Sequence, residues 1–180
     1  MRLLTYEGYN LTIDPMLLAL KPFKAIWQRD KTDKKERAIQ EIAYIYFMED
    51  PRSDYQYITD IDTRESQIRE GEGIKASWKP DGTVKEAQKL YASFKTSSAL
   101  LLEDTRFAID KLRKQLREID LNAVDDKGKP IYTLNVITST IKQIPELIKS
   151  LDEAEKSLAK EIAQNDRVRG AQEKSIYEDM

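Results

Sequence analysis

Three acidic residues with the close spacing of a calcium-binding loop, Asp60, Asp62 and Glu65, are the first candidates for chemistry in this sequence. An EF-hand loop that began at Asp60 would need glycine at its sixth position and a bidentate glutamate at its twelfth. Glu65 and Gly71 stand at those two positions, so neither requirement is met. The cluster indicates a solvated acidic surface, and we predict no metal site.

A second candidate is Gly128-Lys129, which resembles the end of a phosphate-binding loop. That motif needs a glycine five positions before its second glycine and a serine or threonine after its lysine. The chain has Ala123 and Pro130 there, so we interpret the segment as a turn. The basic residues of 111–117 suit the negative end of a helix dipole better than a phosphate site.

The composition limits the function further. The chain of 180 residues has no cysteine and no histidine, which excludes thiolate chemistry and removes the commonest general base. Thirty basic and thirty-two acidic residues leave a net charge of −2, which gives no field for non-specific nucleic-acid binding. We predict a protein that is not an enzyme, with no catalytic residues and no cofactor, and that binds no specific nucleic-acid sequence.

The scaffold is predicted from two long stretches of helical periodicity, residues 83–120 and 133–163. Apolar positions recur about every 3.5 residues in both, as two packed helices require. The predicted seam is formed by the following residues: Val84, Ala87, Tyr91, Phe94, Ser98, Leu101, Thr105, Ala108 and Leu112 in the first stretch, and Leu134, Ile137, Ile141, Ile144, Ile148, Leu151, Glu155, Leu158 and Ile162 in the second. Pro145 predicts a kink, or two helices that meet near residue 150.

The fold class is therefore mainly α: a helical bundle built on a long antiparallel helical hairpin. Asp14-Pro15 begins a helix, and a broad apolar stripe in 34–49 ends at Asp50-Pro51. Residues 1–13 form either a short β-hairpin around Glu7-Gly8 or an irregular arm. We expect a helical domain over 14–163 with an irregular protruding insert at about 52–82, and a C-terminal tail over 164–180. No apolar run is long enough to cross a membrane.

Aromatic and apolar residues in the least regular parts of the chain are the candidates for partner binding, because aromatic side chains dominate interface energetics. The predicted interface comprises Tyr6, Tyr9, Tyr55, Tyr57, Trp78, Ile176 and Tyr177. For Trp78 and the tyrosines of the insert, the alternative is that they cover the ends of the helices.

Two segments carry a resemblance to a known group of proteins. Lys-Pro-Phe-Lys-Ala-Ile-Trp-Gln-Arg-Asp-Lys (21–31) and Ala-Tyr-Ile-Tyr-Phe-Met-Glu-Asp-Pro (43–51) are similar to virion proteins of crAss-like tailed bacteriophages. The resemblance is strongest over residues 21–57 and brings no catalytic motif. It implies a structural protein of the virion that is assembled in the host cytoplasm.

The resulting expectation is a non-enzymatic virion subunit, most simply a head–tail connector of the neck or tail. Such a subunit would form a homo-oligomer, which we expect to be a ring, and would dock on neighbouring proteins such as portal or tail components. The alternatives are a capsid accessory protein and a phage-encoded adaptor or inhibitor that binds a host protein.

Overall fold

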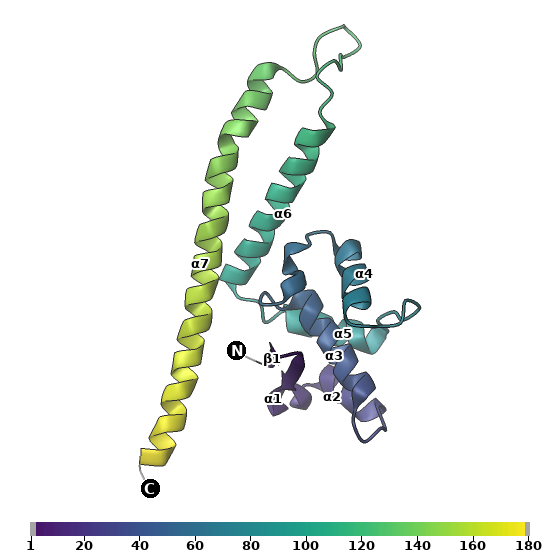
Figure 1. The fold of residues 1–180 in the computed structure, drawn as a ribbon, viewed down its shortest axis with the longest axis vertical. Helices are drawn as coiled ribbons and strands as arrows, with labels where there is room; N and C mark the ends of the chain where they lie inside the picture. Colours follow the sequence, from purple (N-terminus) through teal and green to yellow (C-terminus); the bar gives the residue numbers. More distant parts are fainter. Residues whose placement is uncertain (1–2, 179–180) are drawn as a thin grey trace. The chain divides into compact units, whose positions relative to one another are not determined.

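The computed structural model describes residues 3–178, with the backbone path alone for residues 165–178. Those residues form seven α-helices, one 3-10 helix and one two-stranded β-hairpin, so the mainly helical fold is confirmed (Figure 1). The chain divides into two compact units, Met1–Thr96 and Ser97–Met180, which we call unit 1 and unit 2. The division falls inside the stretch 14–163 that the sequence predicts as one domain.

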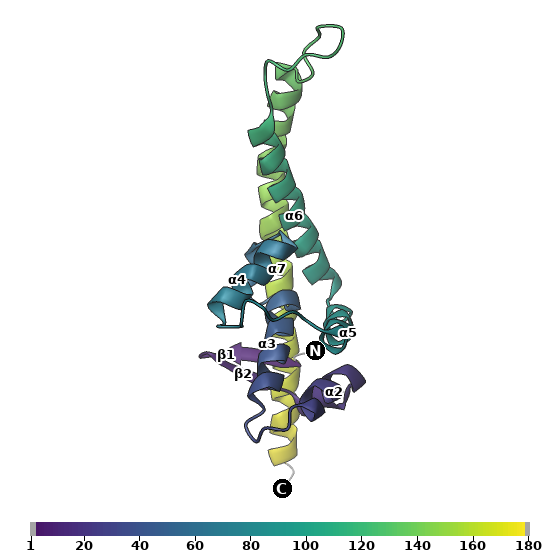
Figure 2. The ribbon, with the colours of Figure 1, turned by 90° about the vertical axis from the view of Figure 1, so that its right-hand side faces the viewer.

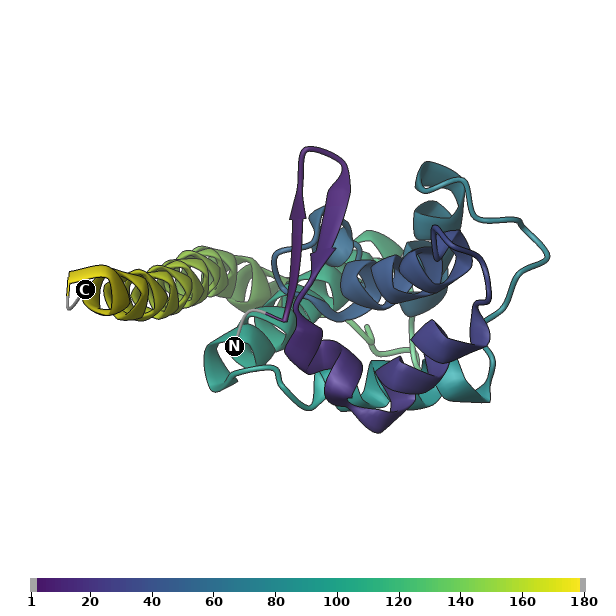
Figure 3. The same cartoon turned by 90° about the horizontal axis from the view of Figure 1, so that it is seen from below.

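The N-terminal arm is a β-hairpin, the first of the two predicted alternatives. Strand β1 (Leu4–Glu7) pairs antiparallel with strand β2 (Asn10–Ile13), with Leu4 opposite Ile13. The turn consists of Gly8 and Tyr9, one residue later than predicted, and both have positive φ angles, of 55° and 64°. Two such residues make the type I′ turn that matches strand twist. The hairpin is seen as a separate ribbon in Figure 3, and its residues Leu4 and Tyr6 pack against the core of unit 1.

Three helices follow: α1 (Pro15–Ala19), α2 (Lys21–Arg29) and α3 (Glu36–Glu49). Asp14 caps α1 by accepting a hydrogen bond from the Met16 amide, and Pro15 occupies the first position as predicted. Helix α3 ends before Asp50-Pro51, also as predicted. Eight of its fourteen residues are buried, so α3 is the central helix of unit 1.

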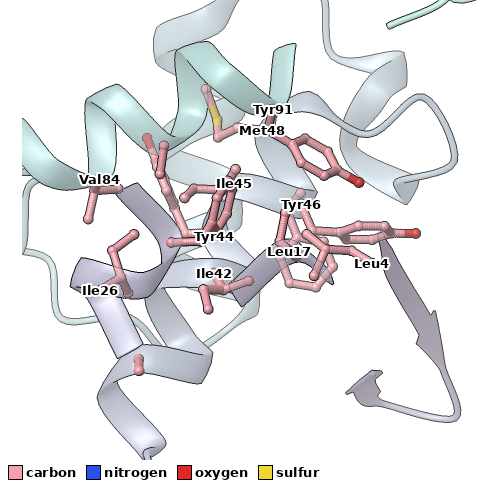
Figure 4. Packing of buried hydrophobic residues seen from close by; sticks show 14 of the residues in the cluster. Leu4, Leu17, Ile26, Ile42, Tyr44, Ile45, Tyr46, Met48, Val84 and Tyr91 are labelled. Carbon is pink, nitrogen blue, oxygen red and sulfur yellow. The ribbon is translucent and has the colours of Figure 1, made fainter. Parts of the chain in front are cut away.

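The core of unit 1 forms where α1, α2, α3, α5 (Gly82–Ala92) and the hairpin converge (Figure 4). Aromatic rings supply much of it, and the edge-to-face geometry of Phe23 with Tyr91 and of Tyr44 with Trp78 is the favourable one. The buried apolar residues are Leu3, Leu4, Leu17, Phe23, Ile26, Ala38, Ile42, Tyr44, Ile45, Tyr46, Phe47, Met48, Ile68, Ile74, Val84, Ala87 and Tyr91.

The segment 52–82, which the sequence predicts as a protruding insert, contributes to this core. It contains the 3-10 helix η1 (Asp54–Tyr57) and helix α4 (Ile61–Gly71), and it buries Ile68 and Ile74. Asp60, from the acidic cluster, caps α4 by accepting a hydrogen bond from the Thr63 amide at 2.9 Å.

Polar side chains from the same segment satisfy the end of α3, where helical carbonyls lack intrahelical partners. Ser53 donates to the Phe47 carbonyl, and Gln56 donates to the carbonyl of Met48 at 2.9 Å. Arg64 also donates to the Met48 carbonyl, at 3.1 Å. These bonds attach η1 and α4 to α3.

The predicted helix over residues 83–120 is wrong as a single element. Helix α5 ends at Ala92 and α6 (Ser97–Glu118) begins after a short break. The chain turns tightly there, because Phe94 and Lys95 donate to carbonyls three residues earlier. Val84, Ala87 and Tyr91 are therefore not seam residues of the long hairpin, because they pack in the core of unit 1.

Unit 2 is the predicted antiparallel helical hairpin, formed by α6 and α7 (Leu134–Glu178), which lie side by side (Figures 1 and 2). The connection is a turn around Gly128, whose φ angle is 74°. Helix α7 passes through Pro145 without interruption, so two helices meeting near residue 150 are not found. It also continues past residue 163, where we expected a tail.

Part of the predicted seam on α7 is not buried, because the buried residues of unit 2 lie along a neighbouring row of that helix. Its buried residues are Ala99, Leu102, Ala154 and Leu158, with Leu151 and Ile162 packed against them. The predicted seam residues Leu101, Leu134, Ile141 and Ile148 are exposed. The physical reason is that small Ala99 and Ala154 allow the helices to approach closely, whereas Glu155 turns outward to pair with Arg106 at 2.9 Å.

Candidate functional site

Four of the predicted interface residues lie together on unit 1, and we call them the tyrosine surface: Tyr6, Tyr9, Tyr55 and Tyr57. The ring centroid of Tyr6 on β1 lies 4.9 Å from that of Phe47. Phe47 also contacts Tyr55 on η1, and the centroids of these two rings lie 5.3 Å apart. A core ring of α3 therefore holds the hairpin and η1 together beneath this surface.

Tyr55 is fixed by a hydrogen bond as well as by packing. Its hydroxyl donates to Glu72 Oε1 at 2.9 Å, and it reaches that acceptor by passing over Gly71. A Cβ atom on Gly71 would lie 2.2 Å from the Tyr55 hydroxyl, so only glycine leaves room for this path. Burial, followed by the hydrogen bond to Glu72, raises the pKa of Tyr55 to about 12.

The edge of the tyrosine surface is acidic. Burial raises the pKa of Tyr6 above its usual 10.0, and the negative charges of Glu72 and Asp54 raise it further. Tyr6 and Tyr55 therefore remain protonated at neutral pH. Neutral phenol rings with carboxylates beside them can hold a partner by stacking and hydrogen bonding, and they supply no nucleophile at that pH.

Two members of the surface are free to meet a partner. Tyr9, at the tip of the hairpin, is 91% exposed, and Tyr57 is 73% exposed. Exposed aromatic side chains are typical anchors of protein–protein interfaces.

Trp78, a further predicted interface residue, has a different aromatic neighbour. The ring of Trp78 packs edge-to-face on the buried ring of Tyr44 in α3, with the ring centroids 4.9 Å apart. Ile176 and Tyr177 are in the part of α7 whose side chains lie outside the described residues.

The buried carboxylate of Asp50 in unit 1 has a charged partner and a hydroxyl partner. Asp50 accepts hydrogen bonds from the Tyr91 hydroxyl at 2.6 Å and from Arg52 Nη2 at 2.7 Å. Arg52 also donates to the backbone carbonyl of Leu4 at 2.8 Å, which ties the hairpin to the end of α3. Burial raises the pKa of Tyr91 strongly. This network is structural, since buried charges need such partners.

Neither a metal site nor a membrane-spanning helix is found in the described part of the chain. No three histidine, cysteine, aspartate or glutamate side chains gather there in a way that could hold a metal ion. Over the same residues, no helix is long enough and apolar enough to span a membrane.

Unit 2 carries the second candidate surface, a line of apolar residues along α7 that we call the outer row: Leu134, Ile141 and Ile148. They follow one another at intervals of seven residues and are 75%, 52% and 55% exposed. Exposed apolar side chains continue into the loop at Leu121, Val124 and Ile131. An apolar line at helical spacing is the surface that one helix presents to another.

Comparison with known proteins found no matching family model, no matching curated protein and no matching solved structure.

Sequence reasoning identified every residue of the outer row but assigned the row to the buried seam. The signal that could have corrected this is Glu155, which continues the row seven residues after Ile148 and is charged. A row that ends in a carboxylate is a poorer buried seam than the neighbouring row of Ile144, Leu151 and Leu158.

Proposed function

We propose that this protein is a non-enzymatic structural subunit that works by assembling with other copies of itself and with neighbouring proteins. The observation that carries the proposal is the incomplete burial of unit 2. Its described residues bury four apolar side chains in the seam, whereas ten large apolar side chains are exposed. Exposed apolar area on this scale marks an interaction site.

The resemblance over residues 21–57 supports the setting, a virion of a tailed bacteriophage assembled in the host cytoplasm. Within a virion we propose a head–tail connector of the neck or tail, where homo-oligomeric subunits, in a ring, dock on portal or tail components. The paired buried charges and the absence of cysteine and histidine from the sequence accord with a structural role.

The experiment is a measurement of mass in solution, by light scattering after size exclusion, for the full chain over a dilution series. We expect a multiple of the single-chain mass. The variant Ile141→Glu places a charge in the outer row and should lower that mass. Lys142→Glu is the matched control, because it adds the same acid one residue away and removes no apolar side chain. A wild-type chain of single mass throughout would contradict the proposal.

A second candidate function rests on the tyrosine surface, which would serve an adaptor or inhibitor that binds a host protein as a monomer. In that function the exposed residues Tyr9 and Tyr57 would contact the host protein. It requires a single-chain mass in solution, together with loss of partner binding in Tyr9→Ser and Tyr57→Ser variants that remain folded.

A further inference from the structure

Strand β2 has an outer edge that carries backbone groups without partners. In a hairpin with a two-residue turn, the residues that flank the turn, here Glu7 and Asn10, form a hydrogen-bonded pair, and such pairs alternate along the ladder. The amide and the carbonyl of both Leu11 and Ile13 therefore point away from β1. In the described part of the chain, no hydrogen bond reaches these outward groups.

The opposite edge of the hairpin, along β1, is partly covered. Arg52 donates to the Leu4 carbonyl at 2.8 Å, so a strand that paired there would have to displace this side chain. Strand β2 has no such neighbour, and its sequence, Asn-Leu-Thr-Ile, contains no charged residue and no proline. Charges and prolines are the features by which natural edge strands avoid further pairing. The edge of β2 can therefore receive another strand.

The two faces of the hairpin allow such an addition. Leu11 and Ile13 lie on the face that packs against the core of unit 1. Asn10 and Thr12 lie on the other face and are exposed. A strand added beside β2 would extend the sheet without opening the core. It would also add stability, because a sheet of two strands alone is marginal in water.

We propose that the added strand is β2 of a second copy, which pairs antiparallel about a two-fold axis at Thr12. Leu11 then forms a hydrogen-bonded pair with Ile13 of the second copy, and Ile13 forms one with its Leu11. All the outward amides and carbonyls of both edges are satisfied in this register. Thr12 faces Thr12 of the second copy, and threonine opposite threonine is a favourable cross-strand pair.

Neighbouring registers satisfy the edge less well. An axis at Ile13 would place Leu11 opposite Pro15 of the second copy, which has no amide proton to donate. An axis at Leu11 would place Ile13 opposite Tyr9, a turn residue with a φ angle of 64°. The pairing about Thr12 is therefore the one that this edge favours.

The same register covers two exposed apolar side chains at the ends of β2. Tyr9 precedes the strand and is 91% exposed, and Met16 follows it and is 57% exposed. Counting outward from Thr12 places Tyr9 opposite Pro15 of the second copy, next to its Met16. Two-fold symmetry makes this contact twice, so self-pairing covers both residues in each copy.

The product is a four-stranded antiparallel sheet shared by two copies. A two-fold interface must be self-complementary, and an edge whose outward groups lie symmetrically about Thr12 meets that condition. The inference rests on the proposed function and names one of its contacts between copies. Because the contact pairs two chains, a ring would need a second contact elsewhere.

Amide hydrogen exchange tests the edge in the unmodified full chain. The amides of Leu11 and Ile13 should exchange freely in dilute protein and should become protected as the protein associates. The amides of Asn10 and Thr12 are the internal control, because they already bond to β1 in the single chain. Free exchange of Leu11 and Ile13 in the associated protein would overturn the proposal. So would protection that appears only when a different protein is added.

Disulfide cross-linking tests the axis, since the chain has no cysteine. Facing residues at a non-hydrogen-bonded pair have Cα atoms about 4.5 Å apart, which a disulfide can span. Full-length Thr12→Cys should therefore form a covalent dimer on mild oxidation. Asn10→Cys is the matched control: it lies on the same exposed face, but its own counterpart would be about 14 Å away. It should remain uncross-linked.

A charge at the axis provides a second variant. Thr12→Lys would place two ammonium groups opposite each other, and self-association should weaken by about fivefold. Thr5→Lys is the control, because Thr5 pairs with Thr12 within the hairpin and lies one strand away from the outer edge. Equal weakening by the two variants would overturn the axis at Thr12.

Light scattering on the same samples separates this inference from the proposed function. An oligomer in which Thr12→Cys fails to cross-link overturns the pairing of β2 and leaves the assembly function standing. A single-chain mass for the wild-type protein overturns both.

Discussion

The two units differ in how completely they bury their apolar residues. Unit 1 gathers seventeen buried apolar residues around α3, and unit 2 gathers four between α6 and α7. Among the described residues, five exposed large apolar side chains precede residue 97 and ten follow it. Helix α3 has neighbours on several sides, whereas two helices alone can hide only a narrow seam.

The difference teaches that the units use apolar residues for different ends. In unit 1 their burial stabilises the core around α3. In unit 2 the same kinds of residue lie on the outside of the hairpin, where the proposed assembly would use them. The predictions below test this contrast, from the largest expected effect to the smallest.

Removing apolar volume should affect the two units unequally. Ile45→Ala in the fully buried part of α3 should lower the free energy of unfolding by about 4 kcal/mol. Leu158→Ala, at the small seam of unit 2, is the matched change and should lower it less. Both tryptophans, Trp27 and Trp78, belong to unit 1, so fluorescence during urea unfolding reports that unit alone.

Circular dichroism reports helices of both units in the same titration. We expect Ile45→Ala to move the fluorescence transition and Leu158→Ala to move only the dichroism transition. If Leu158→Ala moved both equally, the units would unfold as one, and the contrast between them would be lost.

Breaking a buried charge pair should destabilise unit 1 almost as strongly. Arg52→Met removes the partner of buried Asp50 and frees the Leu4 carbonyl, so we expect a loss of about 3 kcal/mol in the free energy of unfolding. Arg37→Met is the control. It breaks the ion pair between exposed Arg37 and buried Glu41, which keeps Arg29 as a partner, and should cost under about 1 kcal/mol. Equal losses in the two variants would contradict the structural role of Asp50.

The close approach of Tyr55 to Gly71, beneath the tyrosine surface, can be tested by adding a methyl group at Gly71. Gly71→Ala should displace the Tyr55 hydroxyl and lower the free energy of unfolding by about 1–2 kcal/mol. Gly82→Ala is the control, since a Cβ there meets nothing within 4 Å. Adding Tyr55→Phe to Gly71→Ala removes the clashing oxygen and should recover part of the loss. Failure of that recovery would place the strain elsewhere.

Local sequence patterns predicted the helices and strands of unit 1 better than they predicted which of these elements pack against one another. The apolar stripe of α3 and its stop at Asp50-Pro51 were readable, because one helix and one proline decide them. The break at residues 93–96 was not readable, because Tyr91, Phe94 and Ser98 keep helical spacing across it. Spacing shows that a face is apolar, and it does not show which neighbour covers that face.

The same limit explains the candidate surfaces. Two adjoining rows of α7 carry apolar residues, and only tertiary packing decides that Leu158 is buried while Ile148 is exposed. Tyr6 and Tyr55 were predicted as interface residues one by one. Their meeting across Phe47 depends on how the hairpin docks on α3, which no local pattern encodes.

The smallest expected effect is a loss of stability in acid, when protonation of Asp30 weakens its hydrogen bonds to the start of α3. Asp30 accepts hydrogen bonds from the Thr32 amide and hydroxyl through one oxygen and from the Ala38 amide through the other. The backbone hydrogen bonds from Thr32 and Ala38 lower the pKa of Asp30 from 3.8 to about 2. Because its folded pKa is depressed, Asp30 stabilises unit 1 above pH 3.8, and this contribution is lost as the pH falls toward 2.

Asp30→Asn keeps one acceptor of the two, so it should lower the Tm of the fluorescence transition at neutral pH by less than Gly71→Ala does. The difference from wild type should shrink as the pH falls from about 4 toward 2, since protonation removes the same acceptor from the wild-type carboxylate. Asp33→Asn, an exposed acid in the same loop, is the control and should leave the transition unchanged. A difference that stayed constant with pH would mean that the ionised form of Asp30 is not what caps α3. Because tryptophan fluorescence reports unit 1 alone, any shift that is seen belongs to the unit with the closed core.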